Sequence, residues 1–263
     1  MYSCKSISLN FHKTQIERNH SSTIGDKMTK ALYMDDSYLT KWNTTIDNVT
    51  DGKYIVLKET AFYPKSGGVD GDTGQITTND GKSYSVIFTG KFSGVISHEV
   101  DNIGLEKNEK VNCEIDWKRR YQLMRYHTAA HVLSGMFYQL YDLLVTGNQL
   151  TTEKGRIDLN MDELDVDLIK NTIQKSNDLI KKDLPVDLYY LTRKEAEKDP
   201  SLSKLATGLP KGIKMIRIVD IKGFDRQADG GCHVKTLKEI GLIQFQKAIS
   251  KGKNFKRVYF TVE

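Results

Sequence analysis

The sequence predicts an α+β protein in which a small antiparallel β-barrel comes first, followed by a domain that mixes helices with mostly antiparallel strands. In residues 54–116, short apolar runs alternate with Asn, Asp and Gly turns, which is typical of a small barrel or sandwich. Farther along, segments with apolar residues at helical steps alternate with strand-like segments, as in α+β domains. We therefore expect a poorly ordered tail over 1–27, a barrel domain over 28–116 and a second domain over 117–263.

The N-terminal part contains the predicted tail and the barrel strands. Residues 1–27 are polar and irregular, and an alternative interpretation makes Met28 the natural start. Strand-like runs follow in YIVL, GQITT, YSVIF and VNCEID, each bounded by turn residues. A glycine-rich stretch, AFYPKSGGVDGDTGQI at 61–76, leads into the second of these runs. Taken alone, that stretch is ordinary turn chemistry between strands.

The second part is expected to begin with a helix over roughly Trp117–Leu144, where apolar side chains recur at helical steps. The segment DELDVDLIKNTIQKSNDLIKKD repeats this spacing and predicts another helix. A short helix is expected at 194–199. Strands are expected at 156–159, 184–191 and 213–221, and in the closing runs GLIQF and VYFTV.

Composition narrows the class of protein. The chain has 263 residues, of which 38% are hydrophobic and 28% charged, a balance typical of a soluble globular protein. No apolar stretch reaches the length of a membrane span, and the first residues lack a secretion signal, so we expect a cytoplasmic protein without a membrane partner. The three cysteines are far apart, which argues against a disulfide framework. The net charge of +5 permits an RNA partner without requiring one.

A pair of histidines is the first candidate for a functional site. His127 and His131 lie in HTAAH, within the first predicted helix. Residues four apart on a helix share one face, so both imidazoles can reach a single ion. Histidines at this spacing also occur as ordinary cap or core residues, so the pair alone predicts little.

A second cluster, Asp229-Gly-Gly-Cys-His233, favours a metal site. Paired glycines allow the sharp turn that brings a carboxylate and an imidazole to one point. Zinc takes Cys, His and carboxylate ligands in a tetrahedron, so we predict one zinc ion held by His127, His131 and His233. Either Asp229 or Cys232 is the fourth ligand. Asp229 is favoured because Cys232 is adjacent to His233, and neighbouring residues rarely both face one ion.

These segments resemble the motifs of a known family. HTAAH, with GGCHVKTLKEIG at 230–241, resembles the editing domain of alanyl-tRNA synthetase and its free-standing relatives, the AlaX proteins. The family commonly has Cys-x-x-x-His with threonine before the histidine, whereas this chain has Asp229 in the cysteine position and Cys232 in the threonine position. The stretch at 61–76 resembles the family's glycine-rich segment, with Val69 in place of the usual glutamine. The resemblance covers roughly Ala31–Leu242 and indicates the medium-length AlaX type.

The resemblance implies a fold and a reaction. The barrel would be translation-factor-like, and the second domain would be of the threonyl/alanyl-tRNA synthetase second-additional-domain type. The family hydrolyses tRNA(Ala) that carries serine or glycine by mistake, because a binding pocket alone separates such small amino acids by only about 1–3 kcal/mol. Zinc would activate a water, polarise the ester carbonyl or bind the substrate's amino group, and the sequence leaves these roles open.

Two other functions are compatible with the motifs. The first is a tRNA-binding module without catalysis, in which the metal is structural. The second is a zinc hydrolase of small amides, which is disfavoured because no glutamate follows His127 as it does in HExxH metalloproteases. The preference for serine or glycine, and the choice between monomer and dimer, stay open.

Further residues are candidates for contact with the mischarged tRNA(Ala). The basic cluster before HTAAH, Lys118-Arg119-Arg120 with Arg125, would hold the acceptor end of the tRNA or would be a solvated helix start. A second basic cluster, Lys251–Arg257, is interpreted as an exposed hairpin. Thr128 would reach a substrate oxygen or bond its own helix, and Gln227 would orient a ligand or serve as a turn residue. The candidates for substrate or tRNA contact are Gly67, Gly68, Asp72, Arg119, Arg120, Arg125, and Thr146 and Asn148 of the predicted VTGNQ turn.

Overall fold

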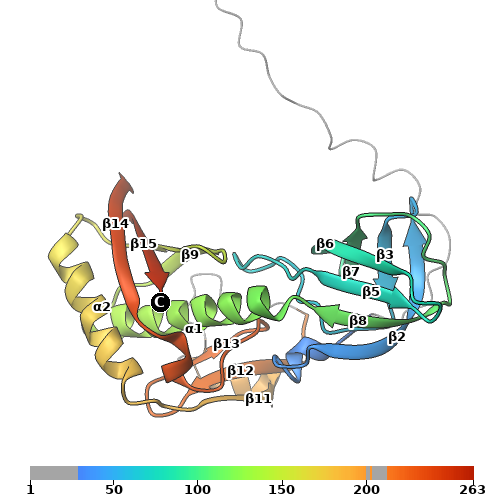
Figure 1. Cartoon of the computed structure of the whole chain (residues 1–263). Helices are drawn as coiled ribbons and strands as arrows, with labels where there is room; N and C mark the ends of the chain where they lie inside the picture. The colour runs from blue at the N-terminus through green and yellow to red at the C-terminus, as the bar shows by residue number, and fades with distance from the viewer. Residues whose placement is uncertain (1–28, 200–201, 203–211) are drawn as a thin grey trace, which may run out of the picture.

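The computed structural model describes residues 29–199, 202 and 212–263, so the predicted tail over 1–27 and Met28 lie outside the described residues. The described chain has two parts that lie side by side (Figure 1). A barrel forms one end, and helix α1 (Trp117–Tyr141) runs from it into the second part, where it lies between two sheets. No described helix is both long and apolar enough to cross a membrane.

Six strands close the barrel in the order β2-β3-β7-β6-β5-β8, with antiparallel neighbours throughout, which confirms the predicted antiparallel barrel. The strands are β2 (Lys41–Thr50), β3 (Tyr54–Leu57), β5 (Gly74–Thr78), β6 (Ser83–Phe92), β7 (Val95–Val100) and β8 (Lys110–Ile115). Beside the barrel, β1 (Lys30–Ala31) pairs in parallel with β4 (Glu59–Thr60). Strand β2 lies outside the predicted runs because only Trp42 and Ile46 of its residues are buried.

The second part mixes helices with two antiparallel sheets, as an α+β domain does. One sheet has the order β14-β15-β10-β9, and the other has the order β11-β12-β13. The strands are β9 (Val145–Leu150), β10 (Gly155–Leu159), β11 (Val186–Thr192), β12 (Met215–Ile221), β13 (Asp225–Ala228), β14 (Ile243–Gly252) and β15 (Phe255–Val262). Besides α1, the described helices of this part are α2 (Val166–Ile180), α3 (Arg193–Ala196) and the 3-10 turn η3 (Leu237–Ile240). Another 3-10 turn, η1 (Leu32–Met34), lies at the barrel end, before the barrel strands.

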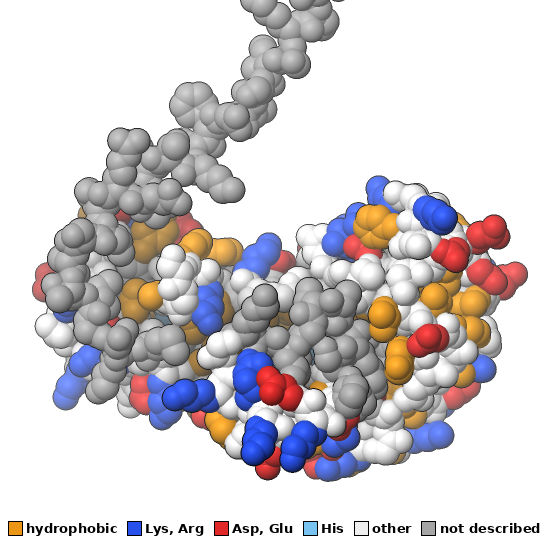
Figure 2. Space-filling view, turned by 180° about the vertical axis from the view of Figure 1, so that it is seen from behind, with side chains coloured by type: hydrophobic (Ala, Val, Ile, Leu, Met, Phe, Trp, Pro, Cys, Tyr) orange, Lys and Arg blue, Asp and Glu red, His pale blue; other side chains and the backbone are white. Residues whose placement is uncertain are grey.

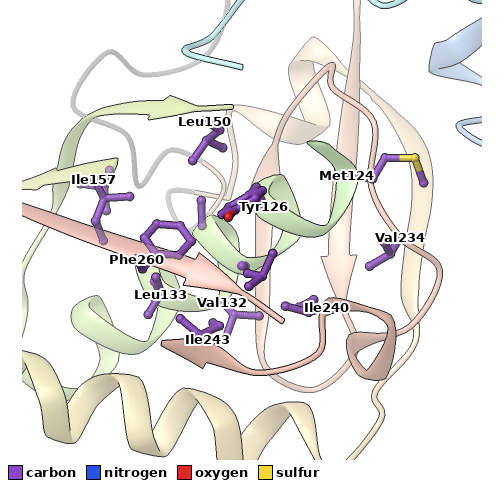
Figure 3. Packing of buried hydrophobic residues seen from close by; sticks show 14 of the residues in the cluster. Met124, Tyr126, Val132, Leu133, Leu150, Ile157, Val234, Ile240, Ile243 and Phe260 are labelled. Carbon is purple, nitrogen blue, oxygen red and sulfur yellow. The ribbon is translucent and has the colours of Figure 1, made fainter. Parts of the chain in front are cut away.

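Helix α1 forms the centre of the second part. Every residue from Tyr126 to Phe137 is buried, a pattern found in helices that are covered on all sides. Leu133 belongs to one hydrophobic cluster with Ile157 and Phe260 of the larger sheet (Figure 3). Because the helix is fixed by this packing, side chains that it carries toward the other sheet are held in place.

Helix α1 ends earlier than the predicted Leu144. Its C-cap is Asp142, in the left-handed conformation with φ 56°, and the backbone N–H of Asp142 donates to Phe137 O and Tyr138 O. The segment VTGNQ, predicted to be a turn, is strand β9, and its Gly147 pairs with Asp158 of β10. The prediction of a turn there was wrong because Asp142 already stops the helix, and β10 provides a partner for the extended chain.

A buried ion pair fastens the barrel to α1. Arg120 Nε donates to both carboxylate oxygens of Asp72 at 3.0 Å, and the two side chains are each 1% exposed. Arg120 also donates to the carbonyl oxygen of Ser37, and Asp72 accepts from the backbone N–H of Tyr63. The assignment of Asp72 and Arg120 to a tRNA-binding surface was therefore wrong, since a phosphate cannot reach charges that are buried and already paired.

Candidate metal centre

Four side chains from two distant segments converge beside α1. The helix supplies His127 and His131 one turn apart, and the loop after β13 supplies Asp229 and His233. One ligand atom from each lies within 4.8 Å of the others, so the group can hold a metal ion. The Nε2 atoms of His127, His131 and His233 lie 3.6, 3.9 and 3.2 Å from a carboxylate oxygen of Asp229.

Hydrogen bonds on the far side of two rings fix their tautomers. The Nδ1 atom of His127 lies 3.3 Å from the carbonyl oxygen of Cys232, which can only accept, so Nδ1 carries the hydrogen. The Thr128 hydroxyl donates to Met124 O at 3.0 Å, so it accepts from His233 Nδ1 at 3.1 Å. Both rings therefore turn the lone pair of Nε2 toward Asp229, which is the tautomer that a metal ligand needs.

Burial keeps two histidines of the cluster neutral, so that their ring nitrogens can donate electron pairs to a metal ion. Burial lowers the pKa of His127 to about 4, while the nearby Asp229 carboxylate opposes the shift. Burial likewise lowers the pKa of His233 well below its ordinary value. Neutral imidazoles and a carboxylate facing one another form a donor set that fits a metal cation.

The loop backbone is shaped to bring Asp229 and His127 together. The N–H of Gly231 donates to Asp229 Oδ1 at 2.6 Å. A Cβ atom at residue 231 would lie 2.7 Å from Nδ1 of the His127 ring, so no residue larger than glycine fits without a shift. The second glycine of the motif is thus required by a close approach to the histidine.

Arg217 of β12 is part of the site's support and was not among the predicted residues. Its Nη1 atom donates to the carbonyl oxygens of Asp229 and Gly231, at 3.0 and 2.8 Å, and its Nε atom donates to Met34 O. The side chain therefore ties the ligand-bearing loop to η1 at the barrel end. The sequence signal for this residue was a basic side chain within the apolar alternation of IKMIRIVDI, since a strand buries such a residue only when it has partners.

Cys232, the alternative fourth ligand, lies outside the ligand group. It is 6% exposed, and burial raises the pKa of its thiol to about 11, so the thiol stays protonated. Its contribution to the cluster is the backbone carbonyl that faces His127. The geometry brings Asp229, and not Cys232, together with the three histidines.

The remaining candidates lie at different distances from this cluster. Thr128 bonds its own helix, as one of its two interpretations expected, and its hydroxyl also lies 3.1 Å from His233 Nδ1. The Gln227 amide donates to Asp225 Oδ2 at 2.6 Å, so its observed partner is not one of the four ligand candidates.

Gly67 and Gly68 form the centre of a tight turn, with φ of 57° and 81°, between Ser66 and Val69, whose backbones bond each other. Strand β9 meets this turn. The N–H of Leu150 donates to Gly68 O at 2.7 Å, and Asn148 lies against Gly68. Thr146 instead donates to the carbonyl oxygen of Asp158 on β10.

The predicted basic cluster is mostly engaged within the protein. Arg119 Nε donates to Gly71 O at 2.9 Å, and its guanidinium lies 3.8 Å from Asp70. Arg125 donates to the carbonyl oxygens of Glu239 and Ile240. Arg119 stays partly exposed beside the glycine-rich turn, whereas Arg125 serves chiefly to hold η3 against α1.

Comparisons with known proteins agree with this fold. Residues 216–259 match the family described as "Threonyl and Alanyl tRNA synthetase second additional domain", and residues 9–119 match "tRNA synthetases class II (A)". The alanyl-tRNA editing protein AlaX-M of Methanosarcina barkeri is 43% identical over 241 residues, which are 89% of this chain and 99% of that protein. The AlaX-M protein of Saccharolobus solfataricus is 42% identical, over 90% of this chain and 100% of that protein.

A larger enzyme shares the same region. An alanine–tRNA ligase of Sulfurisphaera tokodaii is 34% identical over 82% of this chain, which corresponds to 24% of the ligase. The fold and the cluster thus define a protein with the second additional domain of threonyl- and alanyl-tRNA synthetases. The chain belongs to the AlaX-M family of alanyl-tRNA editing proteins.

Proposed function

We propose that this protein is a hydrolase that deacylates tRNA(Ala) carrying serine, and also glycine, in place of alanine. The supporting observation is a cluster of four electron-pair donors, two of which, Asp229 and His233, lie in the segment that matches the threonyl- and alanyl-tRNA synthetase domain. AlaX-M relatives, which carry the name alanyl-tRNA editing protein, align with this chain over nearly their whole length.

We assign the cluster to one zinc ion, with ligands from His127, His131, His233 and Asp229. When bound there, zinc supplies Lewis acidity that activates a water or polarises an ester carbonyl. The chain itself holds the donors in place, through the Cys232 carbonyl and the Thr128 hydroxyl. Asp229 has a side chain 21% exposed, against 0 to 9% for the histidines, so the aminoacyl end of the substrate approaches from the Asp229 side.

A deacylation assay tests this function. Purified protein is mixed with Ser-tRNA(Ala), Gly-tRNA(Ala) and, as a control, correctly charged Ala-tRNA(Ala). We expect release of serine, loss of that release on treatment with a chelator, and recovery when zinc returns. His131→Gln should lower kcat/KM by at least about 100-fold, because loss of one ligand weakens the ion's attachment. Circular dichroism and metal analysis of the same sample show whether the variant is folded and whether it has lost zinc.

A specific observation also supports a tRNA-binding module with a structural metal. Four protein donors can close a tetrahedral shell, and closed shells are typical of structural zinc. That function predicts tRNA binding without turnover, and a lower Tm after removal of zinc. Full deacylation by metal-free protein would contradict the role of zinc in either function.

A further inference from the structure

The larger sheet of the second part has one open face. Helix α1 covers its inner face, where Phe260 of β15 packs against Tyr126, and Asn177 of α2 bonds the backbone of Ile243. Because side chains alternate along a strand, the residues next to the inward Ile157, Val258 and Phe260 point the other way. The residues of this outer sheet face are Arg156, Asp158, Lys247, Arg257 and Tyr259.

The outer sheet face continues into a basic hairpin. Strands β14 and β15 project together from the end of the domain, and blue side chains lie at the top of the corresponding lobe in the opposite view (Figures 1 and 2). From Ile243 to the end of the chain, the only acidic residue is Glu263. The basic residues of this stretch are Lys247, Lys251, Lys253, Lys256 and Arg257. Lys256 turns inward, where its Nζ donates to Asp162 O, and the other lysines are exposed.

The single carboxylate on this face is already neutralised. Arg257 bonds both oxygens of Asp158, at 2.7 and 3.1 Å, and Arg156 Nη2 lies 3.6 Å from the same carboxylate. The Asp158 side chain is 7% exposed, so it adds little repulsion for an approaching anion. Arg156 Nε is buried and has no hydrogen-bond partner among the described residues. The charge that the face presents to solvent is therefore positive.

Aromatic rings lie between these cations. Lys247 Nζ lies 5.0 Å from the centre of the Tyr259 ring, and Arg257 Cζ lies 5.5 Å from the centre of the Phe255 ring. Surfaces that bind a nucleic-acid strand commonly combine cations, which contact phosphates, with aromatic rings, on which bases stack. An acidic protein segment would use the charges but would have less use for the rings.

We propose that the outer sheet face and its hairpin bind the sugar–phosphate backbone of the tRNA, outside the aminoacyl end that enters the metal centre. This inference rests on the proposed function for its choice of RNA. The sheet is also joined to the glycine-rich turn, because the N–H of Leu150 on β9 donates to Gly68 O. The outer sheet face and the glycine-rich turn are therefore held in fixed positions relative to each other. The cations at the start of α1 cannot take this role fully, because Arg120 is buried and Arg125 is bonded to η3.

A binding titration with uncharged tRNA(Ala) transcript tests the docking surface. The variant Lys247→Gln/Lys251→Gln removes two exposed cations, one from the outer sheet face and one from its hairpin, and keeps side chains of similar length. We expect the Kd to rise about fivefold for each lysine, the effect of one charge near a phosphate in water. The slope of log Kd against log salt should fall by about 1 for each phosphate that the variant no longer neutralises. The matched control is Lys175→Gln/Lys182→Gln, on and just after α2, which should change the Kd by less than about twofold.

A second measurement separates this inference from the proposed function. Serine esterified to a short CCA oligonucleotide has no tRNA body, so the Lys247→Gln/Lys251→Gln variant should hydrolyse it as the wild type does. With Ser-tRNA(Ala), the same variant should show a raised KM and an unchanged kcat. If the wild type binds tRNA through these lysines without hydrolysing either substrate, the docking surface stands and the proposed function fails. Equal effects of the two double variants would overturn the docking surface, and so would a wild type that binds anionic vesicles but no tRNA.

Discussion

His98 of β7 shows how burial acts on a titratable side chain far from the metal centre. Its Nδ1 atom lies 2.8 Å from the carbonyl oxygen of Ile55, and its Nε2 atom lies 2.9 Å from the Thr60 hydroxyl. The carbonyl can only accept, so Nδ1 carries the hydrogen and Nε2 is the acceptor. The neutral ring is therefore satisfied on both sides. Burial lowers its pKa from 6.5 to about 4, although the bond to Ile55 opposes the shift.

This shift predicts how stability depends on pH. Below about pH 6.5, His98 is protonated in the unfolded chain, but in the folded protein it stays neutral down to about pH 4. The free energy of unfolding therefore decreases as the pH falls through this window. Between pH 7 and pH 5, His98 should cost about 2 kcal/mol of unfolding free energy. Urea unfolding at both pH values, for the wild type and His98→Gln, isolates this contribution because other groups cancel. An identical pH dependence in the two proteins would rule it out.

Among the elements, the glycine-rich turn is the point where the barrel meets strand β9. Gly68 has φ of 81°, and a Cβ there would lie 2.5 Å from the backbone oxygen of Asn148. Gly67 has φ of 57°, and nothing lies within 4 Å of a Cβ at that position. The two neighbours thus share the left-handed conformation and differ in what surrounds them.

Alanine substitution at the two glycines should separate conformation from contact. Gly67→Ala should lower the unfolding free energy by about 1 kcal/mol, the cost of a left-handed alanine. Gly68→Ala should cost at least about 2 kcal/mol more, because the clash with the Asn148 backbone must be relieved by moving β9. Chemical denaturation of both variants gives the comparison. Equal losses would mean that the turn yields freely and does not hold β9.

Elements with a strong period could be predicted from the sequence, whereas others depended on partners. Helix α2 was predicted because apolar residues recur along it at helical steps, and the HTAAH pair lies on α1 as expected. Strand β9 was not predicted, because VTGNQ has the composition of a turn and is extended only through its pairing with β10. The place of Arg217 beside the ligand-bearing loop likewise depends on a fold that joins β12 to η1.

For the whole molecule, the relation between the barrel and α1 depends on contacts that no local pattern reveals. Asp72 and Arg120 are far apart in the sequence, and each taken alone has the residue type of an exposed position that could bind RNA. Their mutual burial follows from closure of the barrel against α1. The histidine cluster was more predictable, because metal ligands have restricted residue types and spacing.

The junction between the two parts gives the last prediction. Asp72→Asn leaves the Arg120 guanidinium buried without a counter-charge, so the unfolding free energy should fall by about 3–5 kcal/mol. The matched control is Asp70→Asn, two residues earlier. The Asp70 side chain is 22% exposed and pairs with Lys65 at 2.9 Å, so its loss should cost less than about 1 kcal/mol. Urea denaturation followed by tryptophan fluorescence measures both variants, since Trp42 lies in the barrel and Trp117 begins α1. Similar small losses would mean that packing alone, and not the Asp72–Arg120 pair, holds the barrel against the helix that carries the histidines.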